Sequence, residues 1–110
     1  MIAELPVSIA LVTAPAQDVA ERIVRALVEE RLAACGNIVP GVTSIYRWEG
    51  AIQQETEVLI VLKTTRACVA RLIARVKDLH PYDVPEVLAL PVTAGLEAYA
   101  AWVAANVYDR

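Results

Sequence analysis

The residues best suited to catalysis or ligand binding lie in one short segment that contains two prolines. Residues 80–86 read His-Pro-Tyr-Asp-Val-Pro-Glu and contain the only histidine of the chain. Each proline fixes its own φ and pushes the preceding residue towards extended geometry, so His80 and Val84 are kept out of helix. The segment is therefore predicted to be a rigid turn that presents polar side chains, although a connector that only ends a helix fits the same residues.

A neutral imidazole such as that of His80 is a common ligand of copper and other borderline metals. A transition-metal site normally needs three or four protein ligands, and the two cysteines, Cys35 and Cys68, are predicted to lie in separate helical segments. The sequence therefore predicts no certain cofactor, and only weak or subunit-shared coordination of a divalent cation such as copper by His80. Each cysteine otherwise fits as a small buried hydrophobic residue.

A second interpretation is a pocket for a small ligand. Aromatic walls with a few converging polar groups suit such a pocket, especially at a subunit boundary. The candidate ligand-binding residues are Tyr46, Trp48, Lys63, His80, Tyr82 and Glu86. The structural alternative is that the rings of Tyr46 and Trp48 pack subunits together, that Lys63 pairs with Glu86, and that Tyr82 caps a helix end.

An enzyme would use His80 as a general base, oriented by Asp83 or Glu86. No nucleophile elbow, zinc signature or phosphate-binding loop accompanies these residues, and the chain has only four glycines. The net charge of −3 and the absence of phenylalanine argue against a nucleic-acid partner. The sequence therefore favours a binding or scaffold protein that is not an enzyme.

Hydrophobic periodicity predicts the elements that position these residues. Strands are expected at 7–12, 37–49, 51–64 and 86–92, and helices at 18–34, 66–79 and 96–107. Gly36 is predicted to end the first helix. The pair Pro40-Gly41 should bend or bulge an edge strand, and Glu49-Gly50 should form the turn of a hairpin.

The order βαββαβ followed by a helix is typical of the α+β class. It predicts a ferredoxin-like split βαβ fold, with an antiparallel sheet, helices on one face and an extra C-terminal helix. The helices predicted at 66–79 and 96–107 are each expected to bury a stripe of apolar side chains. These are Val69, Leu72, Ile73, Val76 and Leu79 in the second helix, and Leu96, Tyr99, Val103 and Val107 in the last.

The strand composition points beyond a single chain. A sheet covered on one face should alternate apolar and polar residues, yet residues 58–62 and 87–90 are continuously apolar. No apolar run reaches the roughly 18 residues of a membrane span, and residues 1–4 lack the basic start of a signal peptide. We therefore expect a symmetric homo-oligomer with no membrane partner. The lack of a disulfide framework predicts a cytoplasmic location.

Several motifs together resemble the CutA family of divalent-cation tolerance proteins, in one collinear order from residue 7 to residue 107. They are Thr13-Ala14-Pro15, Arg31-Leu32-Ala33-Ala34-Cys35 with Asn37-Ile38, Ser44-Ile45-Tyr46-Arg47-Trp48-Glu49-Gly50, Leu62-Lys63-Thr64-Thr65, His80-Pro81-Tyr82 with Val84-Pro85-Glu86, and Tyr99 with Trp102. The resemblance implies a single CutA-like ferredoxin-like domain over residues 1–110 and a very stable homotrimer built like the PII signalling proteins. It also implies a role in tolerance of copper and other divalent cations, with no established reaction.

The same resemblance argues against tight copper binding. Some CutA members have a second histidine just before the His-Pro-Tyr motif and a cysteine just before Thr-Ala-Pro, both linked to copper, and these positions are Leu79 and Val12 here. The implied function is divalent-cation tolerance with weak metal or small-ligand binding in an inter-subunit cleft. The alternative is a PII-like trimer that binds a small molecule in signalling, or a scaffold, without a metal role.

Overall fold

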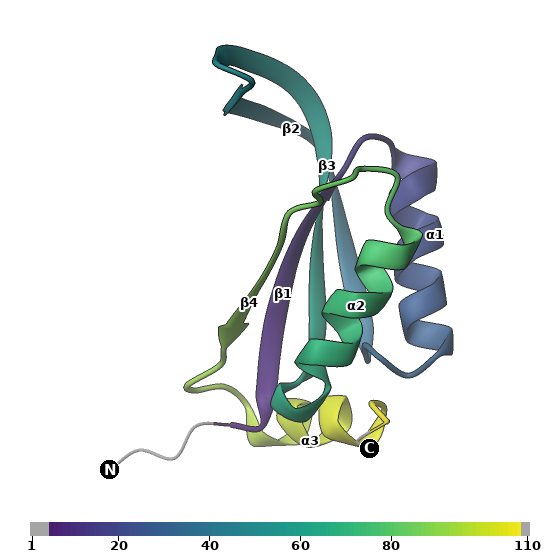
Figure 1. Ribbon diagram of the computed structural model, residues 1–110. Helices are drawn as coiled ribbons and strands as arrows, with labels where there is room; N and C mark the ends of the chain where they lie inside the picture. The colour runs from purple at the N-terminus through teal and green to yellow at the C-terminus, as the bar shows by residue number, and fades with distance from the viewer. Residues whose placement is uncertain (1–4, 109–110) are drawn as a thin grey trace.

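Four antiparallel strands form one sheet in the order β2-β3-β1-β4 (Figure 1). The computed structural model describes residues 5–108, so residues 1–4, on which the signal-peptide expectation rests, lie outside it. The strands are β1 (Val7–Ala14), β2 (Cys35–Trp48), β3 (Ala51–Thr65) and β4 (Val87–Pro91). The helices are α1 (Gln17–Glu29), α2 (Val69–Leu79) and α3 (Glu97–Ala105), and a short 3-10 helix, η1 (Arg66–Cys68), precedes α2. The predicted α+β ferredoxin-like fold is confirmed.

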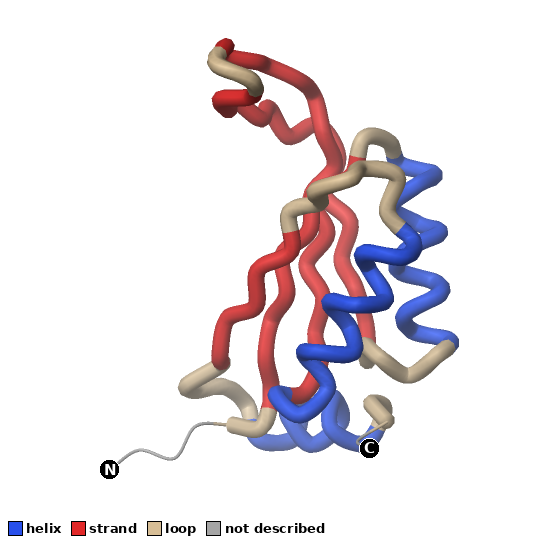
Figure 2. The backbone as a smooth tube through the Cα atoms, viewed as in Figure 1, coloured by secondary structure: helices blue, strands red, loops and turns tan. Residues whose placement is uncertain are grey.

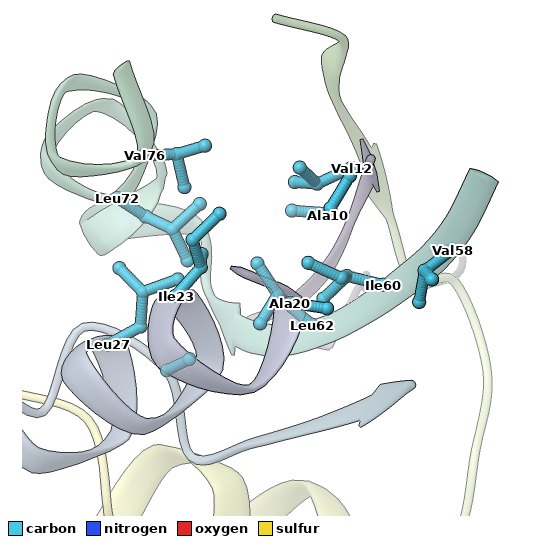
Figure 3. Packing of buried hydrophobic residues seen from close by; sticks show 12 residues of the cluster. Ala10, Val12, Ala20, Ile23, Leu27, Val58, Ile60, Leu62, Leu72 and Val76 are labelled. Atoms are coloured by element: carbon cyan, nitrogen blue, oxygen red, sulfur yellow. The ribbon is translucent and has the colours of Figure 1, made fainter. Parts of the chain in front are cut away.

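The main core lies between the sheet and the two helices α1 and α2. Figure 3 shows Ile23 and Leu27 of α1 beside Leu72 and Val76 of α2, all directed towards the sheet. Burying each such side chain contributes about 1.5 to 3 kcal/mol, so this layer supplies much of the stability of one chain. Within the described residues, no helix is long and apolar enough to cross a membrane.

Helix α3 packs across the end of the sheet where β1 begins and β3 ends (Figure 1). Its buried residues are Ala100 and Val103, joined by Val107 just beyond the helix. The expectation that Leu96 and Tyr99 face inward is wrong, because these side chains are 75% and 44% exposed. The helix is apolar almost all round, so its sequence periodicity does not distinguish an inner face from an outer one.

The first helix ends at Glu29 and not at residue 34, so Gly36 does not end it. Cys35, which was expected in a helical segment, belongs with Gly36 to β2. Arg31 takes the left-handed conformation, with φ of 59°, that reverses the chain after the helix. Gly36 is needed for a different reason. A Cβ atom there would lie 2.8 Å from Cγ1 of Val24 and clash with α1.

The buried apolar stripe of α2 is also narrower than predicted. Leu72 and Val76 are fully buried, whereas Ile73 is 38% exposed. Cys68 is buried in a second core cluster, which also contains Ala100 and Val103 of α3. This position fits its interpretation as a small hydrophobic residue.

The sheet face opposite α1 and α2 carries apolar side chains, and we call it the open face. Leu11 of β1 pairs directly with Val61 of β3 and Leu88 of β4, and paired residues point to the same side. Leu88 is 61% exposed and Leu90 is 51% exposed. In the apolar run 58–62, Val58, Ile60 and Leu62 lie in the core and the alternate residues face the open side. In the run 87–90, only Val87 packs against the core.

The long β2–β3 hairpin bends away from the rest of the sheet at its distal half (Figure 2). As predicted, the register is interrupted at Pro40-Gly41, between Val39 and Val42 of the edge strand β2. The hairpin turn at Glu49-Gly50 is also confirmed, because both residues have positive φ, 50° and 81°. Two left-handed residues match the strand twist in a tight hairpin.

Candidate functional site

A cavity of about 900 Å³ lies between the distal half of the β2–β3 hairpin and the proline-rich loop that joins α2 to β4. We call it the hairpin cavity. Its aromatic lining residues are Tyr46 and Trp48 from β2 and Tyr82 from the loop. Its acidic lining residues are Glu55, Glu57, Asp83 and Glu86.

The bulge at Pro40-Gly41 decides which hairpin side chains face this cavity. Val39 pairs with Leu59 and Val42 pairs with Glu57, so two residues of β2 stand opposite one residue of β3. Beyond the bulge Ser44 pairs with Glu55. Because side chains alternate along a strand, Tyr46 and Trp48 follow on the same side as Glu55 and Glu57.

His80 anchors the proline-rich loop to the end of β1. Its Nδ1 accepts a hydrogen bond of 3.1 Å from the backbone N–H of Tyr82, so the proton of the neutral ring is on Nε2. Nε2 lies 2.7 Å from the carbonyl oxygen of Thr13 and donates to it. Both ring nitrogens are therefore engaged with backbone groups, and the residue is only 7% exposed.

Tyr82 ties the loop to β3. Its hydroxyl donates a 3.1 Å hydrogen bond to Oε2 of Glu57, a carboxylate that is only 7% exposed. Burial, reinforced by this bond to Glu57, raises the pKa of Tyr82 to about 12. The hydroxyl consequently remains a donor across the physiological range. The expectation that Tyr82 caps a helix end is wrong, since the hydroxyl bonds across the cavity instead.

The opposite wall is more open. Burial and the nearby Glu55 carboxylate raise the pKa of the Tyr46 hydroxyl. Trp48 remains 52% exposed although it lines the cavity. About half of the residue surface is thus available for contact with a ligand or with another chain.

The structure brings Tyr46, Trp48, Tyr82 and Glu86 together around the cavity, as the ligand-pocket interpretation requires. His80 lies beside them, with its ring centroid 4.7 Å from that of Tyr82.

Lys63 is not part of this group within one chain. It pairs with Cys35 near the other end of the sheet, and its Nζ donates to the side-chain oxygen of Asn37. The expected pairing of Lys63 with Glu86 is therefore replaced by a contact with Asn37.

Sequence reasoning missed Glu55, Glu57 and Thr13 as lining residues. The signal for the two glutamates was present, because their spacing of two residues in a strand places them on one face. Thr13 gave no comparable signal, since its bond to His80 is made by the backbone carbonyl, which every residue type has.

The two cysteines lie away from the cavity and are not paired with each other. Cys35 Sγ lies 3.4 Å from the hydroxyl of Tyr99, whose ring stacks on Trp102 with centroids 5.7 Å apart. This hydrogen bond with Cys35 raises the pKa of Tyr99. Across the described part of the chain, no three His, Cys, Asp or Glu residues are grouped as a metal site would require.

Comparison with known proteins shows similarity to one protein family. The model of the family described as CutA1 divalent ion tolerance protein matches residues 8–106. The chain is 52% identical over 98 residues to the divalent-cation tolerance protein CutA of Thermus thermophilus, covering 89% of this chain and 95% of that protein. It is 50% identical over 97 residues to protein CutA of Mus musculus, covering 88% of this chain but only 55% of the mouse protein.

The fold agrees with solved structures as well. The crystal structure of CutA1 from Oryza sativa superposes with a TM-score of 0.93 at 38% identity, covering 97% of this chain and 98% of that one. A relative in Arabidopsis thaliana is named chloroplastic, and a similar solved structure from Archaeoglobus fulgidus is named periplasmic.

The bond between Tyr82 and Glu57 generates a test of the site geometry. Tyr82→Phe should lower the free energy of unfolding by about 1 to 2 kcal/mol, because it leaves a buried carboxylate without its donor. The wild type should also lose stability as the pH rises from about 10, the value for an unfolded tyrosine, towards 12. Chemical denaturation at fixed protein concentration at pH 8 and at pH 11 measures both effects. An equal alkaline loss in Tyr82→Phe would show that this hydroxyl is not responsible.

Proposed function

Because the chain belongs to the CutA1 divalent ion tolerance protein family, we propose that it acts as a homotrimer in the tolerance of copper and other divalent cations, with a small-ligand cleft at the subunit boundary. The observation that carries the assembly is the apolar open face. The names of the relatives describe tolerance proteins and not enzymes, which supports a binding role. The two free thiols support a reducing compartment, for which we propose the cytoplasm.

The open face supports assembly because it exposes large aliphatic side chains over neighbouring strands. Leu88 and Leu90 are more than half exposed, and Leu11 and Val61 adjoin them in the sheet. Contiguous exposed apolar area of this kind is typical of an interface. The sheet also has free edges at β2 and β4, which offer unpaired backbone groups to a neighbour. In the proposed trimer, an edge strand of a partner pairs beside the bend at Pro40-Gly41.

The proposed metal role is weak binding at His80. A copper ion at this imidazole has to replace either the Thr13 carbonyl at Nε2 or the Tyr82 N–H at Nδ1. Losing such a bond at a buried group costs free energy. In the trimer, side chains of a second subunit would coordinate the same ion together with His80.

The PII-like alternative is a small-molecule sensor without a metal role. The hairpin cavity favours it, because its volume and aromatic lining suit an organic ligand better than a bare ion. The metal-tolerance role and the small-molecule role require the same trimer. A measurement of cellular metal tolerance is therefore needed to distinguish them.

The assembly is tested by native mass spectrometry at low micromolar concentration. The dominant species should have three times the 11.9 kDa mass of the chain. Leu88→Lys places a charge on the open face and should remove the trimer, either as monomer or as insoluble protein. Ile73→Lys, at an exposed aliphatic residue of α2, is the matched control and should stay trimeric. A monomeric wild type would contradict the proposal.

Copper binding is tested by isothermal titration at two pH values. Cu(II) should bind weakly and less well at the lower pH, because protons compete with the metal for imidazole. His80→Ala should remove most of the binding, while Cys68→Ser should change little because that thiol is buried in the second core cluster. Nanomolar binding that survives His80→Ala would assign the metal to the thiols, with Cys35 the first to examine.

The cellular role is tested by growth in rising concentrations of divalent cations. A strain without the protein should lose tolerance to copper or another divalent cation, and the wild-type chain and Ile73→Lys should restore it. Leu88→Lys should fail to restore it, because the proposed role needs the trimer. A deletion strain as tolerant as its parent to every cation tested would favour the small-molecule alternative.

A further inference from the structure

We propose that the hairpin cavity binds an organic cation of the alkylammonium class, with Glu57 as its counter-charge and the rings of Tyr46 and Trp48 as its walls. The inference rests on the small-ligand role proposed above and specifies the chemistry of that ligand. It follows from three independent features of the cavity, namely a buried carboxylate, the sign of the surrounding charge and the nature of the walls.

The buried carboxylate is Glu57. It is 93% buried, since only 7% of the residue is exposed, and its Oε2 accepts a hydrogen bond from the neutral hydroxyl of Tyr82. Within residues 5–108, no Lys, Arg or His forms an ion pair with Glu57. A buried charge held only by a neutral donor is costly. An ammonium group in the cavity would offset that cost.

The charge around the cavity has a single sign. Glu55, Asp83 and Glu86 line it together with Glu57, and none of its lining residues is Lys, Arg or His. A positive group does approach the loop, where Lys77 Nζ donates to the backbone oxygen of Asp83. The lining nevertheless holds four carboxylates in a chain whose total net charge is only −3. Such a concentration attracts cations and disfavours phosphate-bearing ligands.

The aromatic walls distinguish an organic cation from a metal ion. Ammonium groups are attracted to the faces of Trp and Tyr rings, more strongly when water is excluded. Tyr46 and Trp48 supply such rings on the same strand face as Glu57. A divalent ion would instead need several oxygen ligands at about 2.0 to 2.6 Å, and no three His, Cys, Asp or Glu residues of the described chain are grouped so that they could hold one.

Isothermal titration of the trimer with spermidine and tetramethylammonium tests the proposal, with hexane-1,6-diol as a neutral probe. At least one ammonium probe should bind with a Kd of about 1 mM or lower, and the diol should not bind. Glu57→Gln should weaken binding about 10-fold, because it removes the charge but keeps an oxygen for Tyr82. Trp48→Leu should weaken it about 5-fold, because it keeps apolar contact but loses the ring. Glu49→Gln, at the exposed hairpin turn outside the cavity, should stay within about twofold of wild type.

Native mass spectrometry of the same samples separates failure of this inference from failure of the proposed function. A trimer that binds neither ammonium probe overturns the inference and leaves the assembly intact. A diol that binds as tightly as the amines supports a ligand cavity but overturns its cationic chemistry. Equal binding by Glu57→Gln and wild type, or Mg²⁺ binding tighter than that of the amines, also overturns it. A monomer that binds the amines supports the inference and overturns the trimer.

Discussion

The extra residue in β2 at Pro40-Gly41 is the constraint on which the candidate site depends. Side chains alternate with a period of two, so a strand without the bulge would turn Tyr46 and Trp48 away from Glu55 and Glu57. Gly41, with φ of 74°, provides the left-handed backbone that the bulge needs. Tyr46 and Trp48 therefore share one side of the hairpin with Glu55 and Glu57 because of a local backbone feature.

Two side-chain bonds then hold the proline-rich loop against this surface. His80 joins the loop to the end of β1 through Thr13, and Tyr82 joins it to β3 through Glu57. The prolines at 81 and 85 reduce the conformational freedom that these two bonds must restrict. The histidine that suggests metal chemistry is thus the residue that positions the cavity wall, so a metal bound there would compete with these two hydrogen bonds.

The cavity and the open face are parts of one continuous surface. Along β3, Glu55 and Glu57 of the cavity are followed on the same side by Leu59 and Val61 of the open face. In the proposed trimer, a subunit packed on the aliphatic part lies next to the acidic part. Ligand binding and assembly would then influence each other, because both would contact residues of the same strand.

The fold class, the hairpin turn, the bulge and the apolar excess of the strands can be predicted from the amino-acid sequence, because they depend on periodicity and on turn residues acting over a few positions. The sequence also indicated Tyr46, Trp48, Tyr82 and Glu86 as a group. The position of Lys63 away from this group and the hydrogen bonds at both nitrogens of His80 are visible only in the folded chain. Likewise, Leu96 and Tyr99 are exposed because α3 packs by way of Ala100 and Val103. Such outcomes depend on contacts between residues distant in the chain, which no local pattern of residue types records.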